Sequence, residues 1–227
     1  MIPLYSLHTE SHAVFFDEWF RPSLPDDLDL RSEFCRDTHG GRYRDPAWST
    51  AVVAKSALIL RAIQENPDRV FVYSDVDVQF FGGVEELVRE ALGDLDIVCQ
   101  RDDPEGTLCT GFFAARGSER LFALWSRVRE HVLEEGRDQR AFNELVRENA
   151  AVRADLLPDA FFGAGCGLPG DTVDAEGRWQ YWMPGQRLTL PQDIVLHHAN
   201  WTIGIENKLE QLRHVASVRA RKMTRAS

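Results

Sequence analysis

The chain has 227 residues, of which 44% are hydrophobic and 27% are charged, and its formal net charge is −10. This composition is that of a folded globular protein and excludes the disordered, collagen-like and disulfide-scaffold classes. The acidic balance argues against nucleic acid as a partner, because neutralising phosphates requires a basic surface. No linker-like or repetitive run interrupts the chain, so we predict a single domain over residues 1–227.

Apolar strand-like runs alternate with helix-periodic segments along the chain. This alternation is typical of an α/β domain in which helices cover a largely parallel sheet. The segments expected to form strands are, in chain order, residues 2–7, 28–31, 70–74, 97–100, 110–115 and 193–198. The segments expected to form helices are residues 11–21, 48–65, 84–92, 119–135, 138–149 and a last one from about residue 206. The stretch 162–185 is rich in glycine and proline, and a long loop of this kind is predicted to border the functional site.

No apolar run approaches the roughly 20 residues that span a bilayer, and the N-terminus lacks the pattern of a secretion signal. We therefore expect a soluble cytoplasmic protein. The four cysteines show neither a CxxC pair nor zinc-like spacing, so we expect no metal site or disulfide from them. From about residue 213 to 227 the basic residues have no acidic neighbour. This predicts a helical basic tail that makes a weak contact with an anionic surface, or else a solvated helix end.

The most informative segment is a buried strand that leads into two carboxylates, Asp75 and Asp77. In an extended chain these two side chains project from the same face, about 6.5 Å apart. Such a pair favours a divalent cation, and the carboxyl end of a buried strand is where α/β sheets bind ligands. Two further Asp-x-Asp triplets lie in a turn and in a helix-to-strand connection, which indicates structural roles. They are Asp27/Asp29 and Asp94/Asp96.

A second cluster of polar residues lies near the C-terminus, in the segment 196–201. Because side chains alternate along a strand, His198 and Asn200 share a face. An imidazole beside two carboxylates suits manganese better than calcium, so His198 is a candidate third metal ligand, with a buried structural histidine as the alternative. Lys208 is a candidate phosphate ligand or a solvated helix lysine. Lys55 lies on one face of a helix from which it could reach a nucleotide, but it is interpreted as a surface lysine whose stem lies along the protein.

Three motifs occur together in one order along the chain: Tyr73-Ser74-Asp75-Val76-Asp77, then Asp138-Gln139 with Asn143, then His198-x-Asn200 with Gly204 and Lys208. In this combination the sequence resembles the metal-dependent GT-A nucleotide-diphospho-sugar transferases. The resemblance is closest to the family that contains plant cell-wall xylosyltransferases, and more distant to glycogenin-like enzymes. It covers nearly the whole chain and implies a Rossmann-like GT-A domain, with a mostly parallel central sheet flanked by helices.

The resemblance implies a retaining transfer of a sugar from a nucleotide diphosphate donor, expected to be UDP-linked, to an unidentified glycan, protein or small-molecule acceptor. Asp77 and His198 would bind Mn²⁺ or Mg²⁺, with Asp75 reaching the metal or the donor ribose, and Lys208 would bind the diphosphate. Asp138 and Gln139 would face the donor sugar and the reaction centre. The remaining residues expected at the donor are Leu7, His8, Thr9, Asn200 and Gly204.

Some residues admit a second interpretation. Asp138 also fits a helix N-terminal aspartate that satisfies backbone donors. Aromatic residues beside the long loop would either stack on a sugar ring or anchor the loop to the core. They are Trp179, Tyr181 and Trp182.

Two alternative functions belong to other classes. Asp75 and Asp77 after a strand also resemble the nucleophile strand of haloacid-dehalogenase-type phosphatases, with Asp171 and Asp174 in the place of the distal acidic motif. The aspartate pair lies about 70 residues into the chain, however, whereas in those enzymes it lies near the start of the domain. The other alternative is a non-catalytic protein that binds a sugar nucleotide or glycan.

Overall fold

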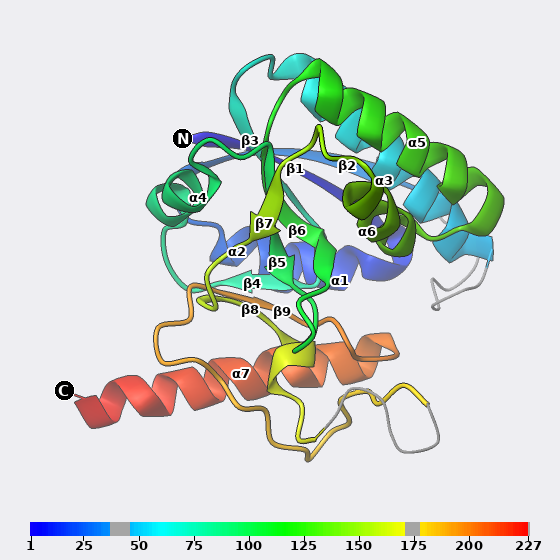
Figure 1. Cartoon of the computed structure of the whole chain (residues 1–227). Helices are drawn as coiled ribbons and strands as arrows, with labels where there is room; N and C mark the ends of the chain where they lie inside the picture. Colours follow the sequence, from blue (N-terminus) through cyan, green and yellow to red (C-terminus); the bar gives the residue numbers. More distant parts are fainter. Residues whose placement is uncertain (37–45, 171–177, 227) are drawn as a thin grey trace.

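Six strands form the central sheet of the computed structural model, which describes residues 1–36, 46–170 and 178–226 (Figure 1). Parallel pairing joins β1 to β2 and β3, and β5 to β7, while β6 runs antiparallel to both of its neighbours. The predicted mostly parallel sheet is therefore confirmed, since β6 alone among these six strands runs in the opposite direction. In sheet order the strands are β2 (Leu28–Cys35), β1 (Ile2–Thr9), β3 (Val70–Ser74), β6 (Leu108–Arg116), β5 (Ile97–Arg101) and β7 (Ala154–Leu156).

Helices cover both faces of this sheet (Figure 1). The main helices are α3 (Pro46–Glu65), α4 (Glu85–Leu92), α5 (Glu119–Glu135), α6 (Asp138–Glu148) and α7 (Ile205–Ala226), each within two residues of its predicted bounds. The predicted helix over residues 11–21 is instead a chain of short turns. These are a 3₁₀ turn (Glu10–His12), α1 (Ala13–Phe15), a π-helical turn (Phe16–Phe20) and α2 (Arg21–Ser23). The expected end before Pro22 is wrong, because proline in the first turn of α2 needs no backbone hydrogen bond there.

Side chains of the central strands alternate between two apolar cores, one on each face of the sheet. On β3, Val72 packs into the core shared with α1, α4 and α7, whereas Phe71 and Tyr73 pack into the core shared with α3, α5 and α6. Phe112 and Phe113 on β6 divide in the same way. This alternation follows from the two-residue period of a strand, and it accounts for the continuously apolar runs in both strands.

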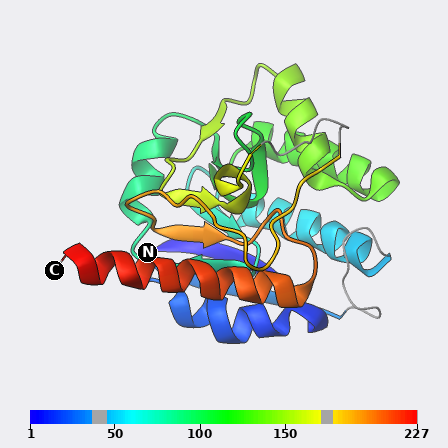
Figure 2. The ribbon, with the colours of Figure 1, turned by 90° about the horizontal axis from the view of Figure 1, so that it is seen from below.

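A second, three-stranded sheet lies between the central sheet and α7, in the order β4–β9–β8 (Figure 2). It consists of β4 (Val78–Phe80), β9 (Leu196–His198) and β8 (Phe161–Gly163). β4 and β8 were not expected, and β9 is shorter than the predicted strand over residues 193–198. Strands of three residues are too short to show a period in the sequence, and this sheet is specified by pairing between distant segments.

The long glycine-rich stretch is only partly a loop. It begins inside β8 and continues as a 3₁₀ turn (Ala164–Gly167). Asp171 and Asp174, which carry the resemblance to phosphatases, lie outside the described residues.

The predicted basic tail is part of α7 and is not a separate segment. The guanidinium of Arg219 donates to the carbonyl of Phe81 at 3.1 Å and lies 4.7 Å from its ring centroid, and Lys222 donates to the carbonyl of Leu190 at 3.3 Å. Contact of this region with an anionic surface stays a prediction. None of the helices in the described residues combines the length and the apolar character needed to cross a membrane.

The two other Asp-x-Asp triplets have structural contacts, as their context predicts. Asp27 Oδ2 accepts the backbone N–H groups of Val84 at 2.7 Å and Glu85 at 2.8 Å, where α4 begins. Asp96 is buried and forms an ion pair with Arg120. Asp27 thus satisfies helix donors that the helix itself cannot satisfy.

Replacing Asp27 by alanine should lower the free energy of unfolding by about 1–2 kcal/mol, the usual cost of a lost helix cap. The exposed neighbour Asp26 provides the matched control, because Asp26→Ala should change it by less than about 0.5 kcal/mol. Urea unfolding of both variants measures the difference. Equal stability of the two variants would contradict the capping role.

Candidate functional site

The carboxyl ends of β1 and β3 meet at one edge of the central sheet. Ser6 of β1 pairs with Ser74 of β3, so Leu7, His8 and Thr9 continue on the side where the aspartate pair follows. β3 ends at Ser74, and residues 75–77 form a bend leading to β4. The expectation that the two aspartates continue the strand is therefore wrong. The positions of the two aspartate side chains therefore depend on this bend and not on the alternation of side chains along a strand.

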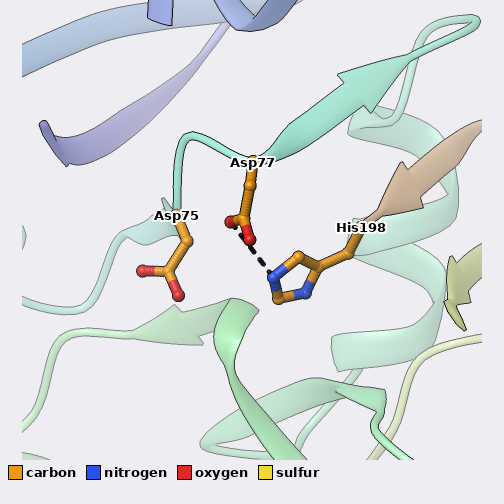
Figure 3. A group of neighbouring side chains, drawn as sticks. All are labelled: Asp75, Asp77 and His198. Carbon is orange, nitrogen blue, oxygen red and sulfur yellow. Dashed lines mark ion pairs between the residues drawn. The ribbon is translucent and has the colours of Figure 1, made fainter. Parts of the chain in front are cut away.

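The bend places Asp75 and Asp77 beside His198 of β9 (Figure 3). One ligand atom from each residue lies within 4.8 Å of the others, and His198 Nε2 is 3.3 Å from Asp77 Oδ1. Two backbone bonds hold the bend, since Asp75 N–H donates to Gly111 O at 2.7 Å and Ala199 N–H donates to Asp77 O at 2.8 Å. The structure thus brings together the three residues predicted as metal ligands.

The contact of its Nδ1 atom with Gln100 orients the ring of His198. Nδ1 lies 2.9 Å from the side-chain oxygen of Gln100, which can only accept, so Nδ1 carries the proton. Nε2 is the ring nitrogen that faces Asp77. His197 lies on the opposite face of β9, where burial and His198 lower its pKa to about 3 and keep it neutral.

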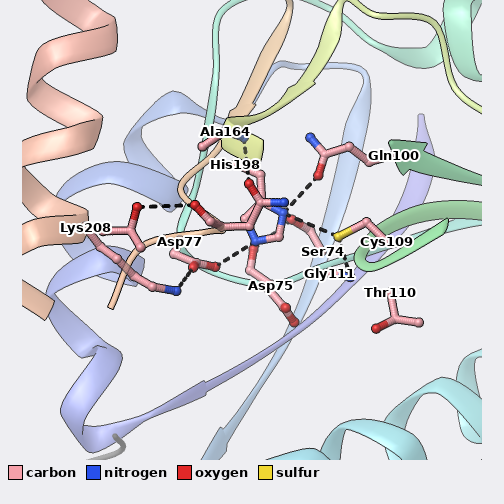
Figure 4. Close-up of polar contacts among 12 residues, drawn as sticks. Ser74, Asp75, Asp77, Gln100, Cys109, Thr110, Gly111, Ala164, His198 and Lys208 are labelled. Atoms are coloured by element: carbon pink, nitrogen blue, oxygen red, sulfur yellow. Dashed lines mark hydrogen bonds and ion pairs between the residues drawn. The ribbon is translucent and has the colours of Figure 1, made fainter. Parts of the chain in front are cut away.

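Lys208 in the first turns of α7 contacts the other oxygen of Asp77 (Figure 4). Burial raises the pKa of Asp77, but Lys208 and His198 outweigh it and hold this pKa well below its ordinary value. The carboxylate is therefore ionised at neutral pH. Gly204, with φ of +91°, provides the left-handed residue before α7, and its carbonyl accepts the N–H of Lys208 at 3.1 Å.

Lys55 is not at the surface, contrary to the sequence interpretation. Its ammonium group is buried and lies 3.2 Å from Asp75 Oδ1 and 3.0 Å from Asp138 Oδ2. Burial lowers the pKa of Lys55, but Asp138 and Asp75 outweigh it and raise that pKa overall. The sequence contained a signal for this burial, because Lys55 lies on the same face of α3 as the buried Val52 and Ile59, at helical spacing.

Asp138 and Gln139 begin α6 beside this lysine. Asp138 accepts the hydroxyl of Thr110 at 2.9 Å, and pairing with Lys55 lowers its pKa although burial acts in the opposite direction. Gln139 Oε1 accepts the N–H of Thr110 at 3.2 Å, and its amide donates to Asp102 at 2.9 Å. The capping position of α6 is occupied by Arg137, and Oδ2 of Asp138 contacts both Lys55 and Thr110. A hydrogen bond from the backbone N–H of Gln139 also lowers the pKa of Asp138, so Asp138 serves a backbone donor of the first helical turn as well.

Asn200 has both ends of its side chain engaged. Its oxygen accepts the N–H of Ala164 at 2.6 Å, and its amide donates to Asp102 Oδ1 at 2.8 Å. Gly111 is a site residue that sequence reasoning did not assign. A Cβ at Gly111 would overlap the His198 ring and lie 2.8 Å from Asp75 Oδ2, so glycine is needed for these two side chains to take their positions.

The predicted nucleoside contacts lie further along the same edge. His8 stacks on Phe16 at 4.0 Å between ring centroids, and burial lowers its pKa. The hydroxyl of Thr9 lies 3.1 Å from that of Ser11 and 3.2 Å from His12 Nδ1. The polar and aromatic groups of this segment therefore border the acidic cluster on the β1 side.

Comparison with known proteins identifies the class of the chain. The family model described as nucleotide-diphospho-sugar transferase matches residues 37–212. The chain belongs to this family, which makes it a glycosyltransferase. A search of curated proteins finds no match.

Two solved structures share the fold. A glycosyltransferase involved in the glycosylation of the major capsid of PBCV-1 is 13% identical, with a TM-score of 0.52 over 72% of this chain and 84% of that one. The apo structure of the bifunctional glycosyltransferase WbbM is 11% identical, with a TM-score of 0.53 over 93% of this chain and 49% of that one. The chain thus spans about half the length of WbbM. Both likenesses establish the GT-A type of α/β fold, and family membership argues against the phosphatase alternative.

Replacing Lys55 by methionine should lower the free energy of unfolding at pH 7 by about 3–5 kcal/mol, because Asp138 would be left buried without its cation. In the native chain the lowered pKa of Asp138 gives stability that is complete above about pH 4 and is lost as the pH falls further. In the variant, burial, the largest single contribution, would raise that pKa against only the hydrogen bonds from Thr110 and the Gln139 N–H. The variant should therefore gain stability from pH 8 to pH 5, which urea unfolding at both pH values measures.

Arg61→Met is the control for this prediction, because Arg61 also lies on α3 and forms an exposed ion pair with Glu33 of β2. Loss of this ion pair should lower the free energy of unfolding by less than about 1 kcal/mol at either pH. Equal unfolding free energies for Lys55→Met and the native chain at both pH values would exclude the buried pairing.

Proposed function

We propose that the chain is a metal-dependent, retaining glycosyltransferase that moves a sugar from a UDP-linked donor to a glycan, protein or small-molecule acceptor. The observation that carries this proposal is the convergence of Asp75, Asp77 and His198, with Lys208 on the same carboxylate. The donor class follows from the family. UDP, the metal and retention rest on the resemblance of the motifs and on the chemistry of these side chains.

The three side chains fit a divalent cation. Two carboxylates and one imidazole suit Mn²⁺ or Mg²⁺, and one ligand atom from each lies within 4.8 Å of the others. Asp77 is ionised, and Nε2 of His198 faces it, so a neutral His198 with its proton on Nδ1 would offer Nε2 to a cation in that place. A cation bound there supplies positive charge that stabilises the leaving nucleoside diphosphate.

Lys208 is suited to binding the diphosphate. Its ammonium group reaches Asp77 from the start of α7, so a phosphate beside that carboxylate lies within its reach. Lys55 has a different task, because its two carboxylate partners bury it. It holds Asp75 and Asp138 in place.

Asp138 and Gln139 are the proposed groups at the donor sugar. Asp138 stays ionised in a buried position, where a fixed negative charge stabilises positive character developing at the anomeric carbon. Gln139 has a side chain oriented by two hydrogen bonds. Both residues begin α6, and Lys55 links Asp138 to Asp75 of the aspartate pair.

Thermal unfolding with UDP and with GDP, each with and without Mn²⁺, tests the donor site. A ligand at 100 times its Kd stabilises by about 2.7 kcal/mol, which raises the midpoint by roughly 5–10 °C for a chain of this size. We expect this rise only with UDP and Mn²⁺ together, and none for Asp77→Ala. A rise in Asp77→Ala, or none in the native chain, would contradict the proposal.

Gly111→Ala tests the metal geometry without removing a ligand. Its Cβ would push His198 away from Asp75, so the shift with UDP and Mn²⁺ should disappear. Gly82→Ala is the matched control, since a Cβ there meets nothing within 4 Å and the shift should persist. Retention of the full shift in Gly111→Ala would place the metal elsewhere.

Asp138→Asn should reduce turnover of the donor by at least about 100-fold, the scale of a lost electrostatic contact to the transition state. Affinity for UDP with Mn²⁺ should change little. Hydrolysis of UDP-glucose, UDP-galactose, UDP-xylose and UDP-N-acetylglucosamine gives the readout, with Glu144→Gln on the exposed side of α6 as the control. Nucleotide binding by the native chain without turnover of any donor would favour the non-catalytic alternative.

A further inference from the structure

Trp201 has a backbone conformation that large side chains rarely adopt. Its φ is +51°, in the left-handed region, and it follows Asn200 directly after the strand that carries His198. A residue in this conformation destabilises the folded state by on the order of 1–3 kcal/mol. It persists where the surrounding structure fixes its position, often at functional sites. The N–H of Trp182 donates to the carbonyl of Trp201 at 2.7 Å and holds this turn.

The indole of Trp201 is also held in place. Its Nε1 donates to Asp102 Oδ2 at 3.0 Å. A Cβ at Gly165 would lie 2.5 Å from Cδ1 and Nε1 of the ring, so glycine is needed for the indole to lie there. A strained backbone, a partly buried hydrogen bond and a glycine together fix this one aromatic ring.

This ring is linked through Asp102 to Gln139, which is one of the residues proposed at the donor sugar. The oxygen of Asp102 that accepts the indole N–H also accepts the amide N–H of Gln139 at 2.9 Å. The other oxygen of the same carboxylate accepts Asn200 Nδ2 at 2.8 Å. Asp102 therefore connects Trp201 to a residue proposed to face the donor sugar.

Two further aromatic rings adjoin Trp201. The ring centroids of Trp179 and Tyr181 lie 5.4 Å and 6.1 Å from its own. Trp182 is different, because it is fully buried and its Nε1 donates to the carbonyl of Gln186 at 3.1 Å. Trp182 thus anchors the loop, whereas Trp179 remains 55% exposed beside the site. We call Trp179, Tyr181 and Trp201 the aromatic platform.

We propose that the aromatic platform is the acceptor subsite and that it binds a pyranose ring. One face of a pyranose presents C–H groups, which pack on aromatic rings, while its hydroxyl groups stay hydrated. The fixed indole of Trp201 forms the floor of this subsite and the exposed ring of Trp179 its outer side. The inference rests on the proposed transferase function and adds a sugar-bearing acceptor to it.

Saturation-transfer NMR with methyl α- and β-glycosides of glucose, galactose, mannose and N-acetylglucosamine tests the subsite, in the presence of UDP and Mn²⁺. We expect saturation of ring C–H protons in at least one glycoside, and roughly tenfold weaker binding by Trp179→Ala. Trp201→Phe, which keeps a ring but loses the bond to Asp102, should also weaken binding. Leu133→Ala removes a side chain of similar exposure on α5 and should bind like the native chain.

Two results would overturn the acceptor subsite: no glycoside binds the native chain, or Trp179→Ala binds as tightly as the native chain. The thermal shift with UDP and Mn²⁺ separates this failure from failure of the proposed function. A native chain that gives the nucleotide shift but binds no glycoside keeps the donor site and loses the subsite. A native chain without the nucleotide shift contradicts the donor site itself.

Discussion

Two lysines form ion pairs with three carboxylates that the fold brings to one edge of its central sheet. Lys55 approaches Asp75 and Asp138 from α3, and Lys208 approaches Asp77 from α7. Anions buried this deeply are tolerated only when they are paired or bind cations. The helices on the two sides of the site must therefore keep their positions relative to the bend after β3, and the rest of the architecture serves that requirement.

The small second sheet gives this arrangement its rigidity. Val78, one residue after Asp77, pairs with His198, and Gly163 pairs with His198 from the other side. The strand that bears the histidine is thus held between the strand that follows the aspartates and the strand before the 3₁₀ turn. A site whose ligands are held by main-chain pairing needs little rearrangement when charge develops during a reaction.

Hydrogen bonds to Asp102 connect this arrangement to the proposed acceptor side. It receives hydrogen bonds from Gln139, Asn200 and Trp201, which come from a helix start, a strand end and a strained turn. Burial raises its pKa, and the hydrogen bonds from Asn200 and Gln139 act against that rise. The donor side and the aromatic platform are therefore parts of one hydrogen-bonded network, so a displacement of Trp201 would be transmitted to Gln139.

The sequence by itself determined the alternation of strands and helices, because those patterns depend on local periodicity, and it identified Asp75, Asp77 and His198 through the order of three motifs. It also indicated that His198 and not His197 faces the site. Tertiary structure alone decided that the aspartates lie in a bend, that Lys55 pairs with Asp75 and Asp138, and that Gly111 and Asp102 belong to the site. Those properties depend on contacts between segments far apart in the chain, and a local pattern carries no information about which segment packs against it.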